Sequence, residues 1–259
     1  MSFPGKYEQL LAIVNRSPGA VAFSGGVDSS LVLRAAVDVF GSATVAFFAD
    51  SVLQPPGEIE NVKMIADLIG CELRIIPADP LSWPEFVANP TERCYLCKKK
   101  IYSLFLDSLA DTGRVLMDGS NLDDLGDDRP GRKAVMELDV KTPLIEAGIG
   151  KDMVRQICRD LGLPNWNKIS ASCLATRFPA GMTITGEKLD RVALYESEMH
   201  KLGFHGCRVR LVAGSGREVR VEVMHDDLEK LGAPILRKNI LQKLLRIGAG
   251  KVCFDPNGR

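Results

Sequence analysis

Short apolar runs and amphipathic stretches alternate along the first half of the chain. Four runs of three to five residues read as strands, at 20–23, 44–48, 73–76 and 115–117. Apolar positions recur at helical spacing in four further stretches, at 29–39, 58–69, 98–109 and 151–161. Strands that alternate with helices predict an α/β fold, in which a parallel sheet carries helices on both faces.

The pattern changes near residue 180. Residues 186–202 have the period of one long helix, and a second helix is predicted at 236–247. Between them, 207–212 and 218–223 alternate apolar and polar residues and are joined by a glycine-rich turn, which predicts a β-hairpin. We therefore expect two domains, 1–180 and 181–259, the second a small α+β domain for substrate binding and oligomerisation. The polar, glycine-rich stretch 119–133 is interpreted as an active-site loop.

Charge and cysteine content narrow the class of protein. The 259 residues contain 33 Lys and Arg against 33 Asp and Glu, so the net charge is zero, which argues against a broad nucleic-acid-binding surface. No run of about 18 apolar residues occurs, and the first ten residues lack the apolar core of a signal peptide. Seven cysteines, an odd number, argue against a disulfide framework in a chain of this size. We expect a cytoplasmic protein without a membrane partner.

The sharpest motif lies where the first predicted strand meets the first predicted helix. It consists of Ser24, Gly25, Gly26, Val27, Asp28, Ser29 and Ser30. Backbone N–H groups at a helix N-terminus form an anion site, and two glycines let the backbone approach a phosphate closely. The serine hydroxyls can donate to phosphate oxygens, and Asp28 can help to place Mg²⁺. The alternative is a tight turn with a helix cap; the spacing is not that of a Walker loop.

Three cysteines are candidates for chemistry. Cys94 and Cys97 form a C-x-x-C pair, whose spacing lets two thiolates reach one metal centre, and Cys173 stands apart in the segment SASCLATR. Three lysines follow the pair directly at 98–100, and their charge would offset an anionic metal centre. A zinc site and a redox pair unrelated to Cys173 remain open as alternatives.

The second predicted domain carries a local basic excess. Residues 200–251 contain eleven Lys and Arg against five Asp and Glu. In the predicted hairpin, Arg208 and Arg210 share one face with Arg220, because successive side chains of a strand alternate in direction. Arginine suits bidentate contact with phosphate, so we expect Arg208 and Arg210 to bind a substrate phosphate; the alternative is a solvated face.

One carboxylate falls inside an apolar helix stripe. Glu196 lies four residues after Val192 and three before Met199, both of which belong to the stripe. A carboxylate in such a place has a partner or a function. We expect either a metal or substrate ligand, together with Asp227 beyond the hairpin, or a salt bridge to an arginine of the hairpin.

Several segments together resemble one enzyme family. The loop matches the SGGxDS motif of the PP-loop ATP pyrophosphatases, which split ATP into AMP and pyrophosphate. With the loop, the segments at 92–100, 118–134, 142–151, 161–181 and 193–204 resemble the ATP-dependent sacrificial sulfur transferases of the LarE family over nearly the whole chain. The resemblance implies that the carboxylates of pyridinium-3,5-biscarboxylic acid mononucleotide are adenylated and converted to thiocarboxylates, for synthesis of the nickel-pincer cofactor.

The resemblance also implies roles for particular residues. ATP and its pyrophosphate, with Mg²⁺, are expected at residues 24–30, and the adenine near Ser51 at the end of the second strand. The loop residues Asp124, Asp128 and Arg129 are expected near the adenylate.

The family has two branches, which differ in their source of sulfur. One branch gives up the sulfur of a single cysteine, and the other holds a [4Fe–4S] cluster on three. Cys94, Cys97 and Cys173 fit the second branch, in which a sulfide on the open iron would be the nucleophile. Thr176 departs from the family's usual CLxSR string by replacing its serine with another hydroxyl.

Two other activities share the loop. A tRNA thiolation enzyme often has a three-cysteine cluster but needs a broad basic surface, and an ammonia-using synthetase would not need the three cysteines together. A non-enzymatic nucleotide-binding regulator would leave the acidic loop and the cysteines unexplained. We therefore expect an enzyme that uses sulfide or another sulfur donor, binds no nucleic acid and forms a homo-oligomer.

Overall fold

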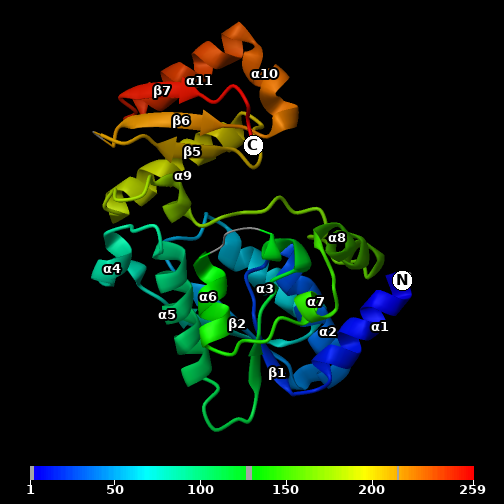
Figure 1. Ribbon diagram of the computed structural model, residues 1–259. Coiled ribbons are helices and arrows are strands. Elements are labelled where there is room, and N and C mark those ends of the chain that lie inside the picture. Colours follow the sequence, from blue (N-terminus) through cyan, green and yellow to red (C-terminus); the bar gives the residue numbers. More distant parts are fainter. Residues whose placement is uncertain (1–2, 127–129, 215) are drawn as a thin grey trace. The chain divides into compact units, whose positions relative to one another are not determined.

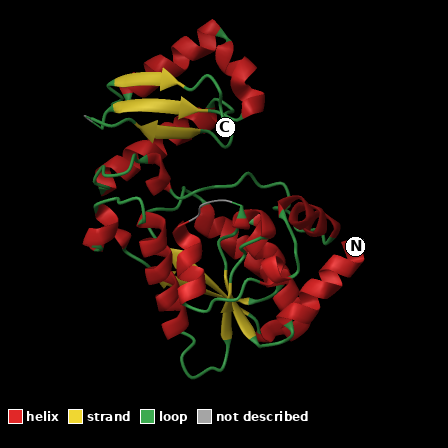
Figure 2. Ribbon diagram, in the orientation of Figure 1, coloured by secondary structure: helices red, strands yellow, loops and turns green. Residues whose placement is uncertain are grey.

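The computed structural model describes residues 3–126, 130–214 and 216–259. Its contacts divide the chain into two compact units (Figures 1 and 2). The first unit comprises Met1–Ser51, Gly57–Ala78 and Glu92–Lys168, and the second comprises Val52–Pro56, Asp79–Thr91 and Ile169–Arg259. The division falls before the expected boundary at 180, and two segments from the first half of the sequence belong to the second unit.

The first unit is built on a four-stranded parallel sheet in the order β3-β2-β1-β4. The strands are β1 (Gly19–Ala22), β2 (Val45–Asp50), β3 (Glu72–Pro77) and β4 (Val115–Met117). Ala20 pairs with Val45 in β2 and with Leu116 in β4. The predicted α/β class is therefore confirmed, with these strands where the apolar runs indicated.

Helices cover both faces of this sheet, and each face has its own core. The helices of the unit are α1 (Phe3–Val14), α2 (Val27–Phe40), α3 (Glu58–Ile69), α5 (Arg93–Asp107), α6 (Pro130–Glu137), α7 (Pro143–Glu146) and α8 (Lys151–Asp160), with 3₁₀ turns η1 (Gly41–Ala43) and η3 (Leu122–Leu125). Val21 faces the core made with α1, α2, α3 and α8, whereas its neighbours Ala20 and Ala22 face the core made with α5 and α6. The alternation of side chains along β1 thus lets both faces of the sheet bury apolar residues.

The second unit is a small α+β body. Its sheet has the order β5-β6-β7, in which β5 (Arg208–Leu211) and β6 (Glu218–Glu222) are antiparallel and β7 (Lys251–Phe254) runs parallel to β6. The helices are α4 (Pro84–Val87), α9 (Gly186–Lys201), α10 (Leu228–Gly232) and α11 (Pro234–Arg246), with η2 (Pro80–Ser82), η4 (Leu174–Arg177) and η5 (His225–Asp227). The predicted hairpin is confirmed, with Val209 paired to Val221 and both fully buried.

Some elements differ from the sequence-based expectations. The helix at the C-x-x-C pair begins at Arg93 rather than at residue 98, so the pair lies in a helix and not before one. The expected loop at 119–133 contains η3, which Asn121 caps, and the start of α6 at Pro130, a residue suited to a first helical turn. The apolar pattern does not predict α1 or β7. None of the helices in the described residues is long and apolar enough to cross a membrane.

Candidate active site

The glycine-rich loop follows β1 in the first unit. Gly25 has a φ of +69°, which glycine adopts without strain, and Gly26 is the N-cap of α2. Gly26 has no side chain that could cap this helix end, an arrangement that suits contact between the first backbone N–H groups and an anion. A Cβ at residue 119 would lie 2.6 Å from the amide nitrogen of Ser29. Gly119 therefore lets the segment after β4 approach the start of α2.

The serines of the motif divide into two kinds. Ser29 and Ser30 are buried, and their hydroxyls donate to the carbonyl of Gly26 at 3.1 and 2.9 Å. Ser24 is exposed, and its Oγ lies 3.1 Å from Oγ of Ser29. The sequence suggests three phosphate donors, whereas in the structure two of the hydroxyls stabilise the loop itself.

Asp28 lies at the centre of a charged network. Its Oδ1 accepts from Nδ2 of Asn121 at 3.2 Å, and its Oδ2 forms an ion pair with Nζ of Lys151. The backbone N–H of Lys151 in turn donates to Oδ2 of Asp123 at 2.7 Å. Sequence reasoning missed Asn121 and Lys151 as site residues, although both lie in segments that carry the family resemblance.

The remaining residues predicted near ATP are less well defined. Ser51 follows the last residue of β2 and is half-buried. Asp124 lies in η3, where its carboxylate accepts from the N–H of Asn121 at 3.0 Å and so forms part of a capping box. Asp128 and Arg129 lie outside the described residues.

A buried carboxylate ties the end of β4 to α5. Asp118 is 2% exposed and accepts from Nζ of Lys98 at 2.8 Å, from the hydroxyl of Tyr102 at 2.8 Å and from the N–H of Ser120 at 2.7 Å. Burial raises the pKa of Asp118, but the Lys98 ammonium and the hydrogen bonds outweigh it, and the net effect lowers the pKa. Lys98, which directly follows Cys97 in the sequence, is therefore paired with the carboxylate of Asp118.

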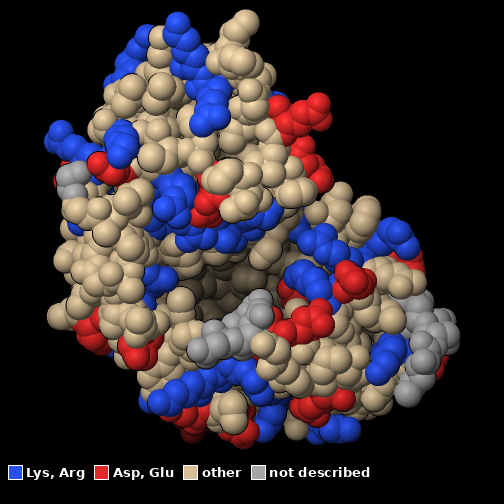
Figure 3. All heavy atoms as spheres, turned by 45° about the horizontal axis from the view of Figure 1, so that its top comes forward, with Lys and Arg blue, Asp and Glu red and all other residues tan. Residues whose placement is uncertain are grey.

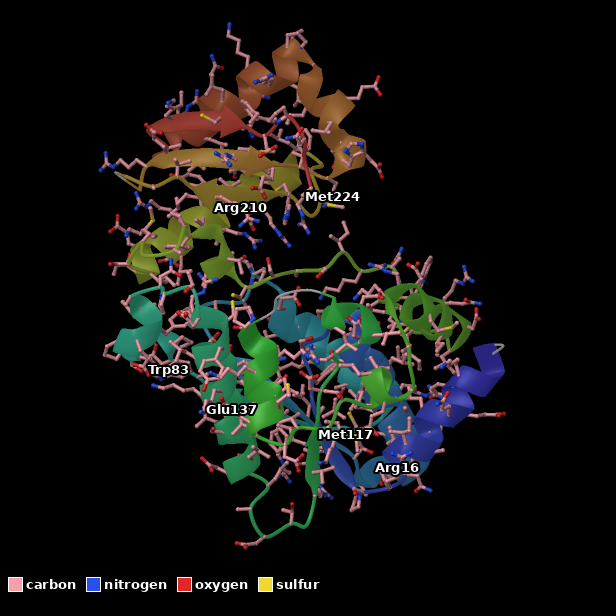
Figure 4. The ribbon with its side chains drawn as sticks, in the orientation of Figure 1. Arg16, Trp83, Met117, Glu137, Arg210 and Met224 are labelled. Atoms are coloured by element: carbon pink, nitrogen blue, oxygen red, sulfur yellow. The ribbon has the colours of Figure 1, made fainter. Side chains whose placement is uncertain are left out.

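Cys94 and Cys97 lie in the first turn of α5, three residues apart and thus on one face. Cys94 is exposed and Cys97 is half-buried. The same helix is joined to α6, because Glu137 accepts from the hydroxyl of Tyr95 at 2.7 Å and from Lys99 at 2.8 Å (Figure 4 labels Glu137). These contacts hold the helix that carries the C-x-x-C pair.

Cys173 belongs to the second unit, where it is the N-cap of η4. Its carbonyl accepts from the hydroxyl of Thr176 at 2.8 Å, and the N–H of Leu174 donates to the carbonyl of Leu53 at 2.8 Å. The threonine that replaces the family's serine thus makes a local hydrogen bond that either hydroxyl could make.

A three-cysteine cluster would draw its ligands from both units. Thiolates are the right donors for an iron–sulfur cluster, and Cys94 and Cys97 share one turn of the first unit. Among the described residues, however, no three His, Cys, Asp or Glu side chains are grouped closely enough to hold a metal ion. The donor chemistry therefore fits a cluster, and Cys94 and Cys97 supply two of its three thiolates from one helical turn.

Glu196 has a partner, and it is not an arginine of the hairpin. The carboxylate is 6% exposed and accepts from Nε of Arg177 at 2.7 Å and from Nη2 of the same residue at 3.0 Å. The hairpin contributes the N–H of Val209, which donates to Oε1 at 2.9 Å. Arg177 also donates to the hydroxyls of Ser172 at 2.6 Å and Thr176 at 2.8 Å. This buried pair therefore fixes the segment on either side of Cys173.

The two arginines of β5 differ in their contacts. Arg210 pairs with Glu222 at 2.6 Å and donates to the carbonyl of Thr176 at 2.6 Å (Figure 4 labels Arg210). Nε of Arg208 is buried and has no hydrogen-bond partner among the described residues. Burial is the main cause that lowers the pKa of Arg208 to about 10, and the nearby charges of Arg259, Arg177 and Arg210 act in the same direction.

These arginines form a cluster with an excess of positive charge, made of Arg177, Arg208, Arg210 and Arg259. A bound anion would stabilise such a cluster, because it would reduce the repulsion among the arginines and accept a hydrogen bond from Nε of Arg208. Figure 3 shows blue Lys and Arg side chains gathered on the second unit. Asp227, at the end of η5, is half-buried and donates its N–H to the carbonyl of Met224 at 2.9 Å.

Comparisons with known proteins place the chain in a family. No family model matches it. It is 36% identical over 239 residues to an uncharacterised protein of Synechocystis sp., covering 92% of this chain and 88% of that protein. It is 35% identical over 248 residues to the pyridinium-3,5-bisthiocarboxylic acid mononucleotide synthase of Lactiplantibacillus plantarum, covering 92% of this chain and 85% of that enzyme.

A more distant similarity reaches a second class of PP-loop enzyme. Over 170 residues the chain is 29% identical to one component of the glutamine-hydrolysing GMP synthase of Methanocaldococcus jannaschii, covering 61% of this chain and 54% of that component. The identity to the synthase of L. plantarum is higher and spans far more of both chains. This chain therefore belongs to the LarE family of ATP-dependent sulfur transferases, which are PP-loop enzymes.

Proposed function

We propose that the protein adenylates the carboxylates of pyridinium-3,5-biscarboxylic acid mononucleotide with ATP and converts them to thiocarboxylates, in synthesis of the nickel-pincer cofactor. The observation that carries the proposal is the similarity, over 92% of the chain, to an enzyme named for the bisthiocarboxylic acid product. The glycine-capped N-terminus of α2 after β1, with Asp28 in its first turn, supports a phosphate site in the first unit.

The first step is adenylation of a substrate carboxylate. A carboxylate oxygen attacks the α-phosphorus of ATP, the new P–O bond forms, and the bond to the β-phosphate oxygen breaks to release pyrophosphate. The loop N–H groups and the ammonium of Lys151 would offset the charge that develops on the pyrophosphate. Mg²⁺ would arrive with ATP, and Asp28 is the carboxylate we propose to orient it.

The second step replaces oxygen with sulfur. A sulfur nucleophile adds to the carbonyl carbon of the acyl adenylate, the C–S bond forms, and the C–O bond to AMP breaks. We propose that Cys173 serves this step as a ligand of the group that carries the sulfur, because it is a half-buried thiol in a segment that Arg177 and Thr176 hold in place.

The source of the sulfur distinguishes the two branches of the family. We propose that Cys94, Cys97 and Cys173 hold an iron–sulfur cluster, since the three are thiolate donors of the right type and Cys94 and Cys97 share one helical turn. Such a cluster would supply a bound sulfide and spare the sulfur of Cys173. The alternative is that Sγ of Cys173 attacks the adenylate and that its Cβ–Sγ bond then breaks with loss of the Cα proton, which releases the thiocarboxylate and leaves dehydroalanine.

The arginine cluster of the second unit is the proposed site for the substrate's phosphate. Arg208 has a buried Nε without an acceptor in the described residues, and a phosphate oxygen would supply one. Arg210 already has Glu222 and the carbonyl of Thr176. We therefore assign direct phosphate contact to Arg208 and a supporting role to Arg210.

Two other PP-loop activities make different demands. A GMP synthase-like synthetase would use ammonia and would not require Cys173, and the similarity to such an enzyme covers 61% of the chain. A tRNA thiolation enzyme would bind RNA through a broad basic surface, whereas the net charge here is zero. Sulfide-dependent formation of a thiocarboxylate, with no retention of tRNA on purification, separates our proposal from both.

The proposal is tested by pyrophosphate release that depends on the mononucleotide substrate. Asp28→Ala should reduce this release by at least about a hundredfold, since it removes a charge from the phosphate site. Asp67→Ala is the control, because Asp67 is an exposed residue of α3. Release that does not require the substrate, or that is unchanged in Asp28→Ala, would contradict the proposal.

A further inference from the structure

Three side-chain donors converge on one carbonyl group of the glycine-rich loop. The carbonyl oxygen of Gly25 accepts from Nδ2 of Asn165 at 3.2 Å and from Nδ2 of Asn61 at 3.4 Å. Nζ of Lys168 lies 3.5 Å from the same oxygen. Asn165 and Lys168 both belong to the segment 163–168 after α8, which lies in the first unit with the loop. A carbonyl oxygen has two lone pairs, so this group is fully used and its direction is fixed.

Fixing this carbonyl also fixes the amide that follows it. In a trans peptide the C=O and N–H groups point in opposite directions, so the N–H of Gly26 points away from Asn165. It donates to Oγ of Ser24, an exposed residue, across a long distance of 3.4 Å. Ser24 lies on the side of the N-terminus of α2, where the phosphate is expected. The side chains that donate to the carbonyl of Gly25 therefore also set the direction of the N–H of Gly26, on the opposite side of the peptide.

Burying the side-chain amide of Asn165 lowers the stability of the fold, which argues for a role beyond packing. The residue is 6% exposed, and its Oδ1 is buried without a hydrogen-bond partner among the described residues. The amide cannot be reversed to satisfy Oδ1, because the carbonyl of Gly25 can only accept. Nδ2 also donates to Oγ of Ser30 at 2.8 Å, and the hydroxyl of Ser30 donates onward to Gly26. An apolar side chain would avoid the unsatisfied oxygen but would lose both contacts with the loop.

Lys168 is held in place by a second partner. Its Nζ lies 2.7 Å from Oε2 and 3.1 Å from Oε1 of Glu58, the first residue of α3. The two side chains are 23% and 17% exposed, so this ion pair is largely removed from solvent. The ammonium is therefore held beside the loop and has less conformational freedom than that of an exposed lysine.

We propose that Asn165 and Lys168 are positioning residues of the phosphate-binding loop. They hold the carbonyl of Gly25 and thereby keep the N–H of Gly26 on the side of Ser24, where it would exchange its long contact with that hydroxyl for a phosphate oxygen of ATP. This inference rests on the proposed function only in that ATP binds at the loop. It assigns a task to the segment 163–168 that neither the motif nor the sulfur chemistry accounts for.

The test is the affinity of folded variants for inorganic pyrophosphate and MgATP, measured by titration calorimetry. Asn165→Ala should bind both about tenfold more weakly, the usual effect of losing one or two hydrogen bonds that orient a site. Asn167→Ala is the matched control, because this exposed asparagine lies two residues away, and it should bind both as the parent does. Lys168→Met should also weaken binding, and Lys168→Arg should restore it, because Arg keeps a cationic donor.

The thermal midpoint of each variant separates positioning from a purely structural role. A structural role would lower the midpoint of Asn165→Ala and leave the pyrophosphate affinity of the folded protein unchanged, and that result would overturn the inference. If Asn165→Ala does not fold, Asn165→Asp keeps the size of the side chain, removes the donor to Gly25 and should weaken binding in the same way. A parent protein that binds no MgATP would instead defeat the proposed function, and the inference with it.

Discussion

At the scale of single residues, the structure separates side chains that look equivalent in the sequence. Arg208 and Arg210 alternate with the same buried face of the hairpin, and the pattern gives them the same expected role. In the fold, Arg210 is satisfied by a carboxylate and a carbonyl, whereas Arg208 has an orphaned Nε among the described residues and a lowered pKa. Alternation along a strand predicts direction, but the partners come from elements distant in sequence.

The two arginines should therefore respond differently to substitution. Arg208→Ala should weaken binding of the substrate mononucleotide and of inorganic phosphate by about tenfold or more, the effect of one charge-assisted contact, without lowering the melting temperature. Arg210→Ala should lower the melting temperature, because it removes the arginine's contacts with Glu222 and the carbonyl of Thr176. Calorimetry and thermal unfolding measure the two effects. Unchanged phosphate affinity in Arg208→Ala would show that the arginine cluster does not bind phosphate and is only a solvated face.

The sequence pattern also identified a polar residue at an apolar position, but it did not identify the partner of that residue. The helical spacing of Glu196 indicated burial correctly, but Arg177 lies 19 positions earlier and enters through η4. Likewise, the motif at 24–30 could be found because its residues are contiguous. Asn165 could not, because it contacts Ser30 across 135 positions of sequence. Local chemistry was predictable, and the residues that orient it were not.

At the scale of elements, apolar periodicity predicted those strands and helices that bury a full stripe. It missed α1, whose Pro4 and Gly5 read as a turn although Leu10 and Val14 are buried. It missed β7, because this four-residue strand gives little alternation until β6 pairs with it. It also started α5 too late, since the first turn lacks a regular apolar stripe and the helix is held by contacts with α6 and with Asp118.

The link between β4 and α5 has a predictable dependence on pH. The pKa of Asp118 is lowered in the fold, relative to about 3.9 in an unfolded chain. The carboxylate therefore contributes stability that is present above about pH 4 and lost as the pH falls through the lowered folded pKa. At pH 7, Asp118→Asn should lower the free energy of unfolding by about 1–3 kcal/mol, because Lys98 loses its counter-charge.

Denaturant unfolding of the parent and of Asp118→Asn, measured from pH 7 down to about pH 3, tests this. The difference between them should shrink below about pH 4. Asp139→Asn is the control, because the Asp139 side chain is 89% exposed and its pair with Lys141 is a surface contact. A difference between the parent and Asp118→Asn that stays constant over the range would show that the carboxylate's charge is not what stabilises the link.

At the scale of the whole molecule, the candidate chemistry is divided between two units. The first supplies the loop, Asp28 and the C-x-x-C pair, and the second supplies Cys173 and the arginine cluster. Two short segments of the first half, at 52–56 and 79–91, belong to the second unit, so the single boundary at 180 that the hydrophobic pattern predicts differs from the division in the structure. The sequence predicts the parts of the site, and the structure divides its three cysteines between the two units.

That division makes the cysteines the decisive whole-molecule test. We expect the chain, reconstituted anaerobically with iron and sulfide, to bind iron and absorb visible light, since Cys94, Cys97 and Cys173 are thiolate donors of the right type. Each single Cys→Ala change among them should lose the iron and the absorbance, because two thiolates do not hold a cubane cluster firmly. Cys253→Ala should keep both, since Cys253 is an exposed cysteine of β7 outside the proposed site.

Intact-protein mass spectrometry after turnover then identifies the source of sulfur. A mass lower by that of H₂S at Cys173, with full activity in Cys94→Ala and Cys97→Ala, would show that the residue's own sulfur is consumed and that the C-x-x-C pair has no part in the transfer.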